Sequence, residues 1–462
     1  MNLQYIGRLL TKGYSPLMVV LCMAMLCGHV LPVVSSLTVF HIFVAVTAML
    51  AMLLRAPMPR LYYVVAAYFL FYTVWTIGAT MLWPQELGLK EVLKFCMIAI
   101  SSVALLRMML ASPGKMLRLF FYVCIGYVLL MTGIGVVEHL SGWHLPTSAY
   151  YGQTPPSRIA TGLSYNQNDY SVLLVMAALY VFAYSTLFMG KKASWVGYIA
   201  IGLSLPMLWW NECLTGIAAV GIAIVYHLVR TQVRKQSVAI CYCMALAVIV
   251  AACVGVVLAW PVIEPRLKIY ALSVSSLFDS YGLGFGINGD KFYLSRVNNY
   301  EITHGLTNAH SYLLQILFTS GLPVFLFYCL VIVNIMAHSA KNGRNLLWLM
   351  PILYLILLFS PSSALYMWGH YVFFCVYVCY AVYVAEQGAG SVEREAGSGQ
   401  PTVRGSYRIP VFLLARIMGI YGSWSGGGPV MVRGWSGDGP IKDGQTTEGR
   451  RCGNGTRIVN KK

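Results

Sequence analysis

The feature that most constrains this chain is a series of apolar runs, each close to 20 residues long, recurring from residue 16 to about residue 385. A helix of that length crosses the ~30 Å hydrocarbon layer of a bilayer. Because lipid offers no hydrogen-bond partners, such a run must satisfy its backbone groups internally and folds as a helix. Of the 462 residues, 58% are hydrophobic and only 10% are charged, which excludes a soluble globular domain.

These runs predict an all-α polytopic membrane protein with about twelve transmembrane helices. The first run lacks a small-x-small cleavage site and is too long for a signal peptide, so it is predicted to be an uncleaved anchor. The seventh and eighth runs are the least clearly separated. The predicted spans are 16–35, 37–54, 61–83, 91–110, 116–137, 170–189, 194–210, 213–229, 236–260, 309–337, 345–365 and 367–385.

Basic residues give the predicted topology, because cytoplasmic connections retain Lys and Arg. They fall in alternate connections, which predicts that both termini are cytoplasmic. The formal net charge of +17 is then a topology signal and a basic tail beside anionic lipid, and it does not indicate nucleic acid. The residues concerned are Arg8, Lys12, Arg55, Arg60, Arg107, Lys115, Arg118, Lys191, Lys192, Arg230, Arg234, Lys235, Lys341 and Arg344.

The chain divides by composition into a membrane domain, 1–385, and a Gly-rich basic cytoplasmic tail, 386–462. The tail has too few aliphatic residues to offset its ordering entropy and is predicted to be disordered. Within it, 408–421 reads either as a short interfacial helix or as unstructured chain. Two outer connections, 138–169 and 261–308, are long, and long connections are where function concentrates. The active face is therefore predicted to be extracytoplasmic.

His310 stands at the head of an apolar run and is a candidate general base. If Asn308 or Thr307 caps the helix, His310 lies in its first turn, where the macrodipole keeps the imidazole neutral. The alternative is a polar residue resting at the membrane interface.

The run at 309–337 is too long for one crossing, since it would extend roughly 40 Å as a helix. Gly321-Leu322-Pro323 interrupts it. We expect a short outer segment from 310 to about 319, then a break, then the true crossing.

Several Lys and Arg residues map to the predicted outer side, although positive charge is normally retained on the cytoplasmic side. Their position there predicts that they bind an anionic partner. The planar guanidinium of arginine suits diphosphate oxygens. Pairing with outer acids or with lipid headgroups is the alternative. These cations are Lys90, Lys94, Arg158, Arg266, Lys268, Lys291 and Arg296.

Two local patterns lie in the second outer connection. The segment 266–279 has apolar residues at helical spacing and predicts a helix on the outer surface. The sequence GLGFG at 282–286 is either a flexible turn or a loop that brings backbone N–H groups to a phosphate. No DxD, HExxH or CxxC spacing occurs, so we expect neither a metal nor a cofactor, and the cysteines form no disulfide framework.

Several of these motifs together resemble the O-antigen ligase and O-antigen polymerase family. They are GWHLPTS at 142–148, RIATGLSYNQNDY at 158–170, Arg266, GLGFG at 282–286, and Asn308-Ala309-His310-Ser311 with Gly321-Leu322-Pro323. The resemblance spans about 138–330 and implies a metal-independent membrane glycosyltransferase with a variant GT-C fold. Such an enzyme moves a glycan from an undecaprenyl diphosphate carrier to an acceptor hydroxyl at the outer face of the bacterial inner membrane.

By that resemblance His310 matches the general base, while Arg158 and Arg266 match diphosphate-binding positions. The spacing of His310, Ser311 and then nine residues to Gly321 is similar to the ligase pattern. Lys268, Lys291, Arg296, Asn168 and Asp169 are the further substrate-binding candidates.

The chain also departs from the family pattern. Many members carry Ser-Arg-Gly where this chain has Leu214-Thr215-Gly216, and many carry Glu where it has Thr319. A second diphosphate arginine is then missing, or Arg296 or Lys268 supplies it.

The His-Leu-Pro-x-Ser stretch before Arg158, with Asn168-Asp169-Tyr170 after it, looks more like capsule or teichuronic-type polymerases than lipid A-core ligases. A ligase for lipid A-core or another acceptor is the alternative, and a transporter or flippase of lipid-linked sugars is a third, since fold-level resemblance does not settle function. The expected partners are the undecaprenyl-diphosphate-linked donor, a glycan or lipid acceptor, the bilayer and a chain-length regulator.

Overall fold

The computed structural model describes residues 18–19, 21–23, 26, 32–34, 37–54, 57–83, 89–189, 193–232, 260–297, 309, 311–340 and 368–397. Several predictions therefore lie outside the described residues. They concern His310, the caps Thr307 and Asn308, most of the span 16–35, the span 236–260 apart from its last residue, the span 345–365, and the tail from 398 onward.

The regular secondary structure of the described chain is helical apart from one short antiparallel hairpin, whose strands pair Pro32 with Thr38 and Val34 with Leu37. This hairpin was not predicted, and it lies where the first span was expected to end. The elements are β1 (Pro32–Val34), β2 (Leu37–Thr38), α2 (Val39–Leu53), α3 (Arg60–Thr80), α4 (Leu89–Leu110), α5 (Pro113–Ser141), α6 (Gln167–Phe188), α8 (Trp195–Trp210), α9 (Leu214–Gln232), α11 (Trp260–Asp279), α12 (Gly289–Val297), α14 (Tyr312–Ala340) and α16 (Trp368–Gly397).

Six helices of the described chain are long and apolar enough to cross a membrane: Arg60–Thr80, Glu91–Leu110, Pro113–Ser141, Gln167–Phe188, Tyr312–Ser339 and Gly369–Glu386. Helices α2, α8 and α9 are shorter but also apolar. The prediction of a helical, multi-pass membrane protein is confirmed at this level. The count of twelve spans and the variant GT-C architecture stay predictions.

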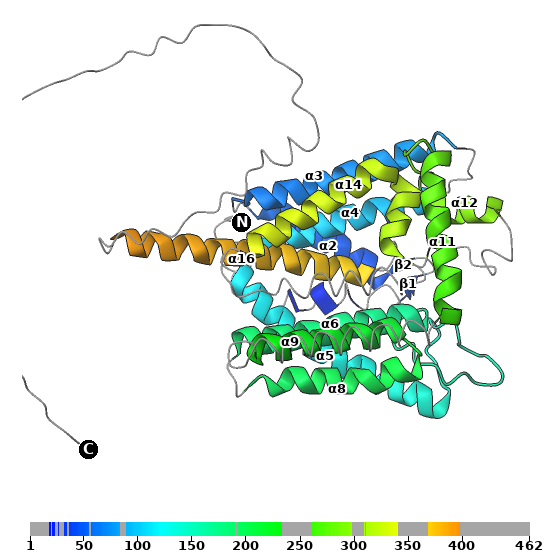
Figure 1. Cartoon of the computed structure of the whole chain (residues 1–462), viewed down its shortest axis with the longest axis horizontal. Helices are drawn as coiled ribbons and strands as arrows, with labels where there is room; N and C mark the ends of the chain where they lie inside the picture. Colours follow the sequence, from blue (N-terminus) through cyan, green and yellow to red (C-terminus); the bar gives the residue numbers. More distant parts are fainter. Residues whose placement is uncertain are drawn as a thin grey trace, which may run out of the picture. The chain divides into compact units, whose positions relative to one another are not determined.

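Two helix groups pack side by side (Figure 1). One contains α2, α3, α4 and α14, and the other contains α5, α6, α8 and α9. Helix α16 contacts members of both groups. Every residue of α6 from Asp169 to Ser185 is buried, because α5, α8 and α9 pack around this helix.

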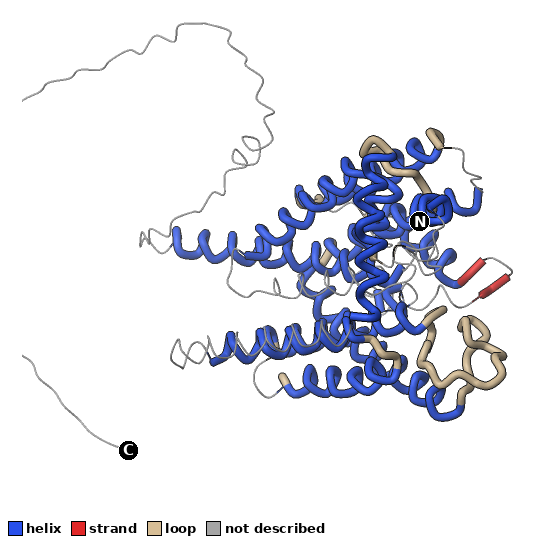
Figure 2. Tube along the Cα trace, turned by 45° about the vertical axis from the view of Figure 1, so that its right-hand side comes forward, coloured by secondary structure: helices blue, strands red, loops and turns tan. Residues whose placement is uncertain are grey.

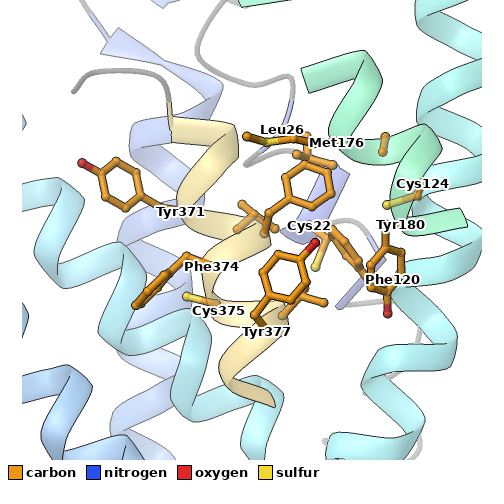
Figure 3. Packing of buried hydrophobic residues seen from close by; sticks show 14 of the residues in the cluster. Cys22, Leu26, Phe120, Cys124, Met176, Tyr180, Tyr371, Phe374, Cys375 and Tyr377 are labelled. Carbon is orange, nitrogen blue, oxygen red and sulfur yellow. The ribbon is translucent and has the colours of Figure 1, made fainter. Parts of the chain in front are cut away.

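Figure 3 shows the packing between these groups. The side chain of Cys22 lies among Phe120 of α5, Tyr180 of α6 and Tyr377 of α16. Tyr180 also donates a hydrogen bond to the Leu117 carbonyl at 3.0 Å, which satisfies its hydroxyl inside an apolar interior.

Helix α11 lies across one end of the bundle, roughly perpendicular to the helices beneath it (Figure 1). The loop 142–166 and α12 lie at the same end, and Figure 2 shows the loop in tan beyond the end of α5. The opposite end holds the start of α3, the end of α4 and the start of α5. Of the basic residues predicted to be cytoplasmic, Arg60, Arg107, Lys115 and Arg118 therefore lie at the end away from α11, although the sidedness itself stays a prediction.

Helix α16 continues to Gly397, past the predicted start of the tail at 386. The division of the chain into a membrane domain and a disordered tail otherwise stays a prediction.

Candidate functional site

A buried carboxylate anchors the loop that follows α5. Glu138, in the last turn of that helix, is 0% exposed. Its Oε2 accepts hydrogen bonds from the N–H groups of Thr161 and Gly162, both at 2.6 Å. The Thr161 hydroxyl donates to Oε1 at 3.0 Å. A charge is tolerated in the interior only when it is paired and hydrogen-bonded, so Glu138 fixes the turn at 161–162 to the end of α5.

His144 completes this buried arrangement. Its Nδ1 lies 3.4 Å from Glu138 Oε1, and its Nε2 lies 2.9 Å from the Ser157 carbonyl oxygen. The ring is 3% exposed. The carbonyl can only accept, so Nε2 carries a proton and donates to it. His144 lies near the beginning of the loop 142–166, and Ser157 lies in its second half. The buried ring therefore links these two parts of the loop to each other and to Glu138.

A second imidazole holds the neighbouring peptide. His139 Nδ1 lies 2.7 Å from the Arg158 carbonyl oxygen, and its ring stacks on Trp210 with centroids 3.9 Å apart. The backbone at Arg158 is thus held on both sides, while the Arg158 side chain itself is exposed. A fixed backbone that carries an exposed guanidinium is suited to receiving an anion.

The other end of the loop is tied to α6 and α8. Asn211 accepts from the Ala160 N–H at 2.9 Å and donates to the Ala160 carbonyl at 2.7 Å. Asn166 caps α6: its Oδ1 accepts from the Asp169 N–H at 2.9 Å, and its Nδ2 donates to Asp169 Oδ2 at 3.0 Å. This reciprocal pair gives Asp169 a capping role. Its role in substrate binding, like that of the partly exposed Asn168, stays a prediction.

Helix α11 confirms the helix predicted over 266–279. Arg266 is partly exposed on it. Burial raises the pKa of Tyr270 to about 12, and the positive charge of Arg266 opposes that rise. Lys268 Nζ lies 3.0 Å from Glu264 Oε1, so for Lys268 the alternative of pairing with an outer acid holds. Both side chains are nearly half exposed, and an ion pair of this kind contributes little to stability.

Helix α12, which was not predicted, carries two further cations. The Arg296 guanidinium lies 4.2 Å from the centroid of the Phe292 ring, and Lys291 is exposed. Cation–π contact leaves the N–H groups of Arg296 able to bind an acceptor. Lys291 and Arg296 therefore remain candidates for binding an anion.

Asp290 connects α12 to the start of α14. Its Oδ2 accepts from Gln315 Nε2 at 2.9 Å and from the Ala309 N–H at 3.4 Å. The carboxyl is 4% exposed, and burial raises its pKa although these hydrogen bonds oppose the rise. Ala309 directly precedes His310 in the sequence. Asp290 thus fixes the backbone N–H of Ala309, the residue that precedes His310 in the sequence.

The Gly-rich segment 282–286 is neither a phosphate loop nor a free turn. The N–H groups of Phe285 and Gly286 donate to the carbonyls of Phe318 and Thr319, at 2.7 and 2.8 Å. The N–H groups of the other three residues also donate to acceptors in the chain. Every donor that the phosphate interpretation needs is therefore used, and the segment pairs with the break in α14.

That break is where it was predicted. Gly321 has φ 68° and ψ −165°, which separates a short first segment, 312–320, from the longer part of α14. The Leu322 N–H donates to the Gly282 carbonyl at 2.8 Å, and the Trp75 and Trp83 indoles donate to carbonyls of residues 283 and 284. Together with the bonds to Phe318 and Thr319, these contacts fix the Gly-rich segment to both parts of α14 and, through Trp75, to α3.

The described start of α14 has a cap of its own. Helix α14 begins at Tyr312, and the Ser311 carbonyl accepts from the Gln315 N–H at 2.9 Å. Ser311 Oγ also accepts from the Leu314 N–H at 3.5 Å, so Ser311 is the N-cap. The caps predicted at Thr307 and Asn308, and with them the place of His310 in a first helical turn, concern residues outside the described ranges and stay predictions.

The described arginines proposed to bind diphosphate lie on elements that pack against different helices. Arg158 belongs to the loop packed on α5, whereas α11 and α12, which carry Arg266 and Arg296, contact α14. All of these elements lie at one end of the bundle in Figure 1. The convergence of Arg158, Arg266 and His310 in one cleft stays a prediction. Within the described ranges, no group of three His, Cys, Asp or Glu residues is placed to hold a metal ion.

Sequence reasoning missed the residues that build this end of the molecule. Glu138 and Asp290 read as ordinary outer acids because their partners lie 23 and 25 residues away along the chain. The one local signal was the position of Glu138 directly after an apolar run. That position does not indicate which residues the carboxylate contacts. Comparison with protein-family models, with curated proteins and with solved structures finds no match in any of the three.

Proposed function

We propose that this protein is an integral membrane glycosyltransferase that polymerises undecaprenyl-diphosphate-linked oligosaccharide repeat units of a cell-surface polysaccharide. The motif resemblance over 138–330 supports this proposal. The observation that carries it is the exposed Arg158 side chain on a backbone fixed by the buried Glu138 network. Such a loop fixes the backbone from which the guanidinium extends, so that only side-chain conformational entropy is lost when it binds a diphosphate.

The proposed reaction needs one base and fixed cations. His310 takes the proton from the acceptor hydroxyl as its oxygen bonds to the anomeric carbon of the donor. The bond between that carbon and the diphosphate oxygen breaks, and the leaving diphosphate takes the electron pair. Arg158 and Arg266 stabilise the charge that develops on it, more effectively in a partly dehydrated site than in water. Attack from the face opposite the leaving group inverts the anomeric centre.

Feeding lipid-linked repeat units to the purified full-length protein tests the proposal. We expect a ladder of longer lipid-linked glycans, its loss in His310→Ala, and a slower ladder in Arg158→Ala and Arg266→Ala. Arg118→Ala, an exposed arginine at the other end of the bundle, is the matched control and should leave the ladder unchanged. A full ladder from His310→Ala overturns the proposed mechanism.

The same assay separates the alternative functions. Transfer only to an added acceptor such as lipid A-core, without longer lipid-linked chains, identifies a ligase. Movement of the lipid-linked sugar across liposome membranes without any new glycosidic bond identifies a transporter.

A further inference from the structure

A groove of about 420 Å³ opens between α2, α3 and α4, far from the candidate active end. Its volume falls in the range of small-molecule sites. Small side chains on all three helices create it, among them Ala48 and Ala51 of α2, Ala66 of α3 and Ala99 of α4. The lining is otherwise almost entirely apolar, so a hydrocarbon chain fits it better than a polar ligand.

One cation lines the groove. Arg107 is in the last turn of α4, and its Nη2 donates to the Leu54 carbonyl at 2.6 Å, beyond the end of α2. Its Nε is buried and has no hydrogen-bond partner among the residues that the structure describes. A buried N–H without an acceptor costs free energy, so an acceptor supplied by a ligand stabilises this arrangement.

The dimensions fit a lipid of one leaflet. From Ala99 to Arg107 the groove follows α4 for about 12 Å, close to half of the ~30 Å hydrocarbon layer. Arg107 is near the end of its helix, and Ala99 lies deeper toward the membrane middle. A lipid placed with its chain along the alanines therefore brings its phosphate to the guanidinium.

From this charge complementarity we propose that the groove binds an anionic glycerophospholipid, one acyl chain lying in it and the headgroup phosphate accepting from Arg107. Basic pockets between transmembrane helices are known sites for anionic headgroups on the cytoplasmic side, where the charge pattern places Arg107. The site is separate from the proposed reaction and does not depend on it.

Native mass spectrometry of the delipidated full-length protein tests the proposal, with phosphatidylglycerol and phosphatidylcholine as probes. We expect the wild-type chain to retain phosphatidylglycerol about fivefold more strongly, the ratio that one cation provides. Arg107→Gln should remove this preference while still retaining lipid, and Arg107→Lys should keep most of it. Arg118→Gln, at an exposed arginine of α5, should behave as the wild-type chain does.

Substitutions that fill the groove test the part of the proposal that places an acyl chain in it. Ala48→Phe should lose both lipids, whereas Ala45→Phe, an exposed position outside the groove on the same helix, should retain them. If Ala48→Phe does not fold, the Arg107 variants decide the question alone. Retention of neither lipid by the wild-type chain, or an unchanged preference in Arg107→Gln, overturns the proposal.

Discussion

Gly284 and Gly321 are in such close contact that a Cβ on Gly284 would come within 2.5 Å of the Gly321 nitrogen. Both have positive φ, 81° and 68°. The contact joins the Gly-rich segment before α12 to the break in α14. It explains why both glycines are needed: one side chain at either position would push the two backbones apart.

Gly321→Ala should therefore destabilise the protein by about 2–4 kcal/mol, combining a strained backbone with a steric clash. Thermal unfolding of the detergent-purified protein measures this. Gly133→Ala is the matched control, because that exposed helical glycine of α5 has open space around it. The control should be neutral or slightly stabilising. Equal unfolding temperatures for Gly321→Ala and the wild type would contradict the structure.

Glu138→Ala should cost about 3–5 kcal/mol, because it leaves two buried N–H groups and His144 without their carboxylate. Glu138→Gln keeps one acceptor oxygen and should cost less. Unfolding temperature and protease cleavage within 142–166 report the two effects. The exposed Glu212 provides the control, and Glu212→Ala should change neither readout. If Glu138→Ala is no more cleavable than the wild type, the carboxylate does not hold the loop.

Asp290→Asn should change how stability depends on pH. Burial raises the pKa of Asp290, so its carboxyl holds a proton more tightly in the folded chain than in the unfolded one. That stabilisation is present below the ordinary carboxyl value of 3.8 and is lost as pH rises through the raised value. The asparagine oxygen can keep both hydrogen bonds, since both go to Oδ2.

The unfolding temperature of Asp290→Asn should consequently exceed that of the wild type at pH 7, and the difference should shrink toward pH 4. Glu212→Gln, at an exposed carboxylate, should show no such trend. A difference that stays constant across this pH range would rule out a titrating Asp290.

Arg158→Ala should reduce the rate of glycan extension by roughly 10²-fold, the loss expected when one donor to a developing anion is removed. Because the side chain is exposed, the unfolding temperature should not change. Arg158→Lys keeps the charge without the planar fork and should recover part of the rate. A fall in stability that matches the loss of rate would assign Arg158 a structural role instead.

What could be predicted from the sequence followed from local signals. Apolar runs of the right length predicted the helices, and Gly321 beside Pro323 predicted the break in α14 because both residues act on their own backbone. Ser311 was not predicted as a cap, because several residues before this run are good caps and only tertiary packing selects among them.

The rest depends on contacts that no local pattern specifies. The Gly-rich segment looked like a turn or a phosphate loop, since nothing within it indicates that its donors bond to residues 318 and 319. Glu138 likewise gives no sign in the sequence that Thr161 and Gly162 will surround it. The hairpin at 32–38 takes the end of one predicted span and the start of the next, where composition alone favoured helix.

The pairing of the Gly-rich segment with α14 also imposes an order on biogenesis. The N–H groups of Phe285 and Gly286 donate to the carbonyls of residues 318 and 319, so they lack these acceptors until the ribosome has synthesised that later part of the chain. The end of the molecule that carries α11 and α12 therefore completes its folding only after this later helix has been made. A nascent chain arrested between the two segments should be recognised by quality-control proteases as incomplete.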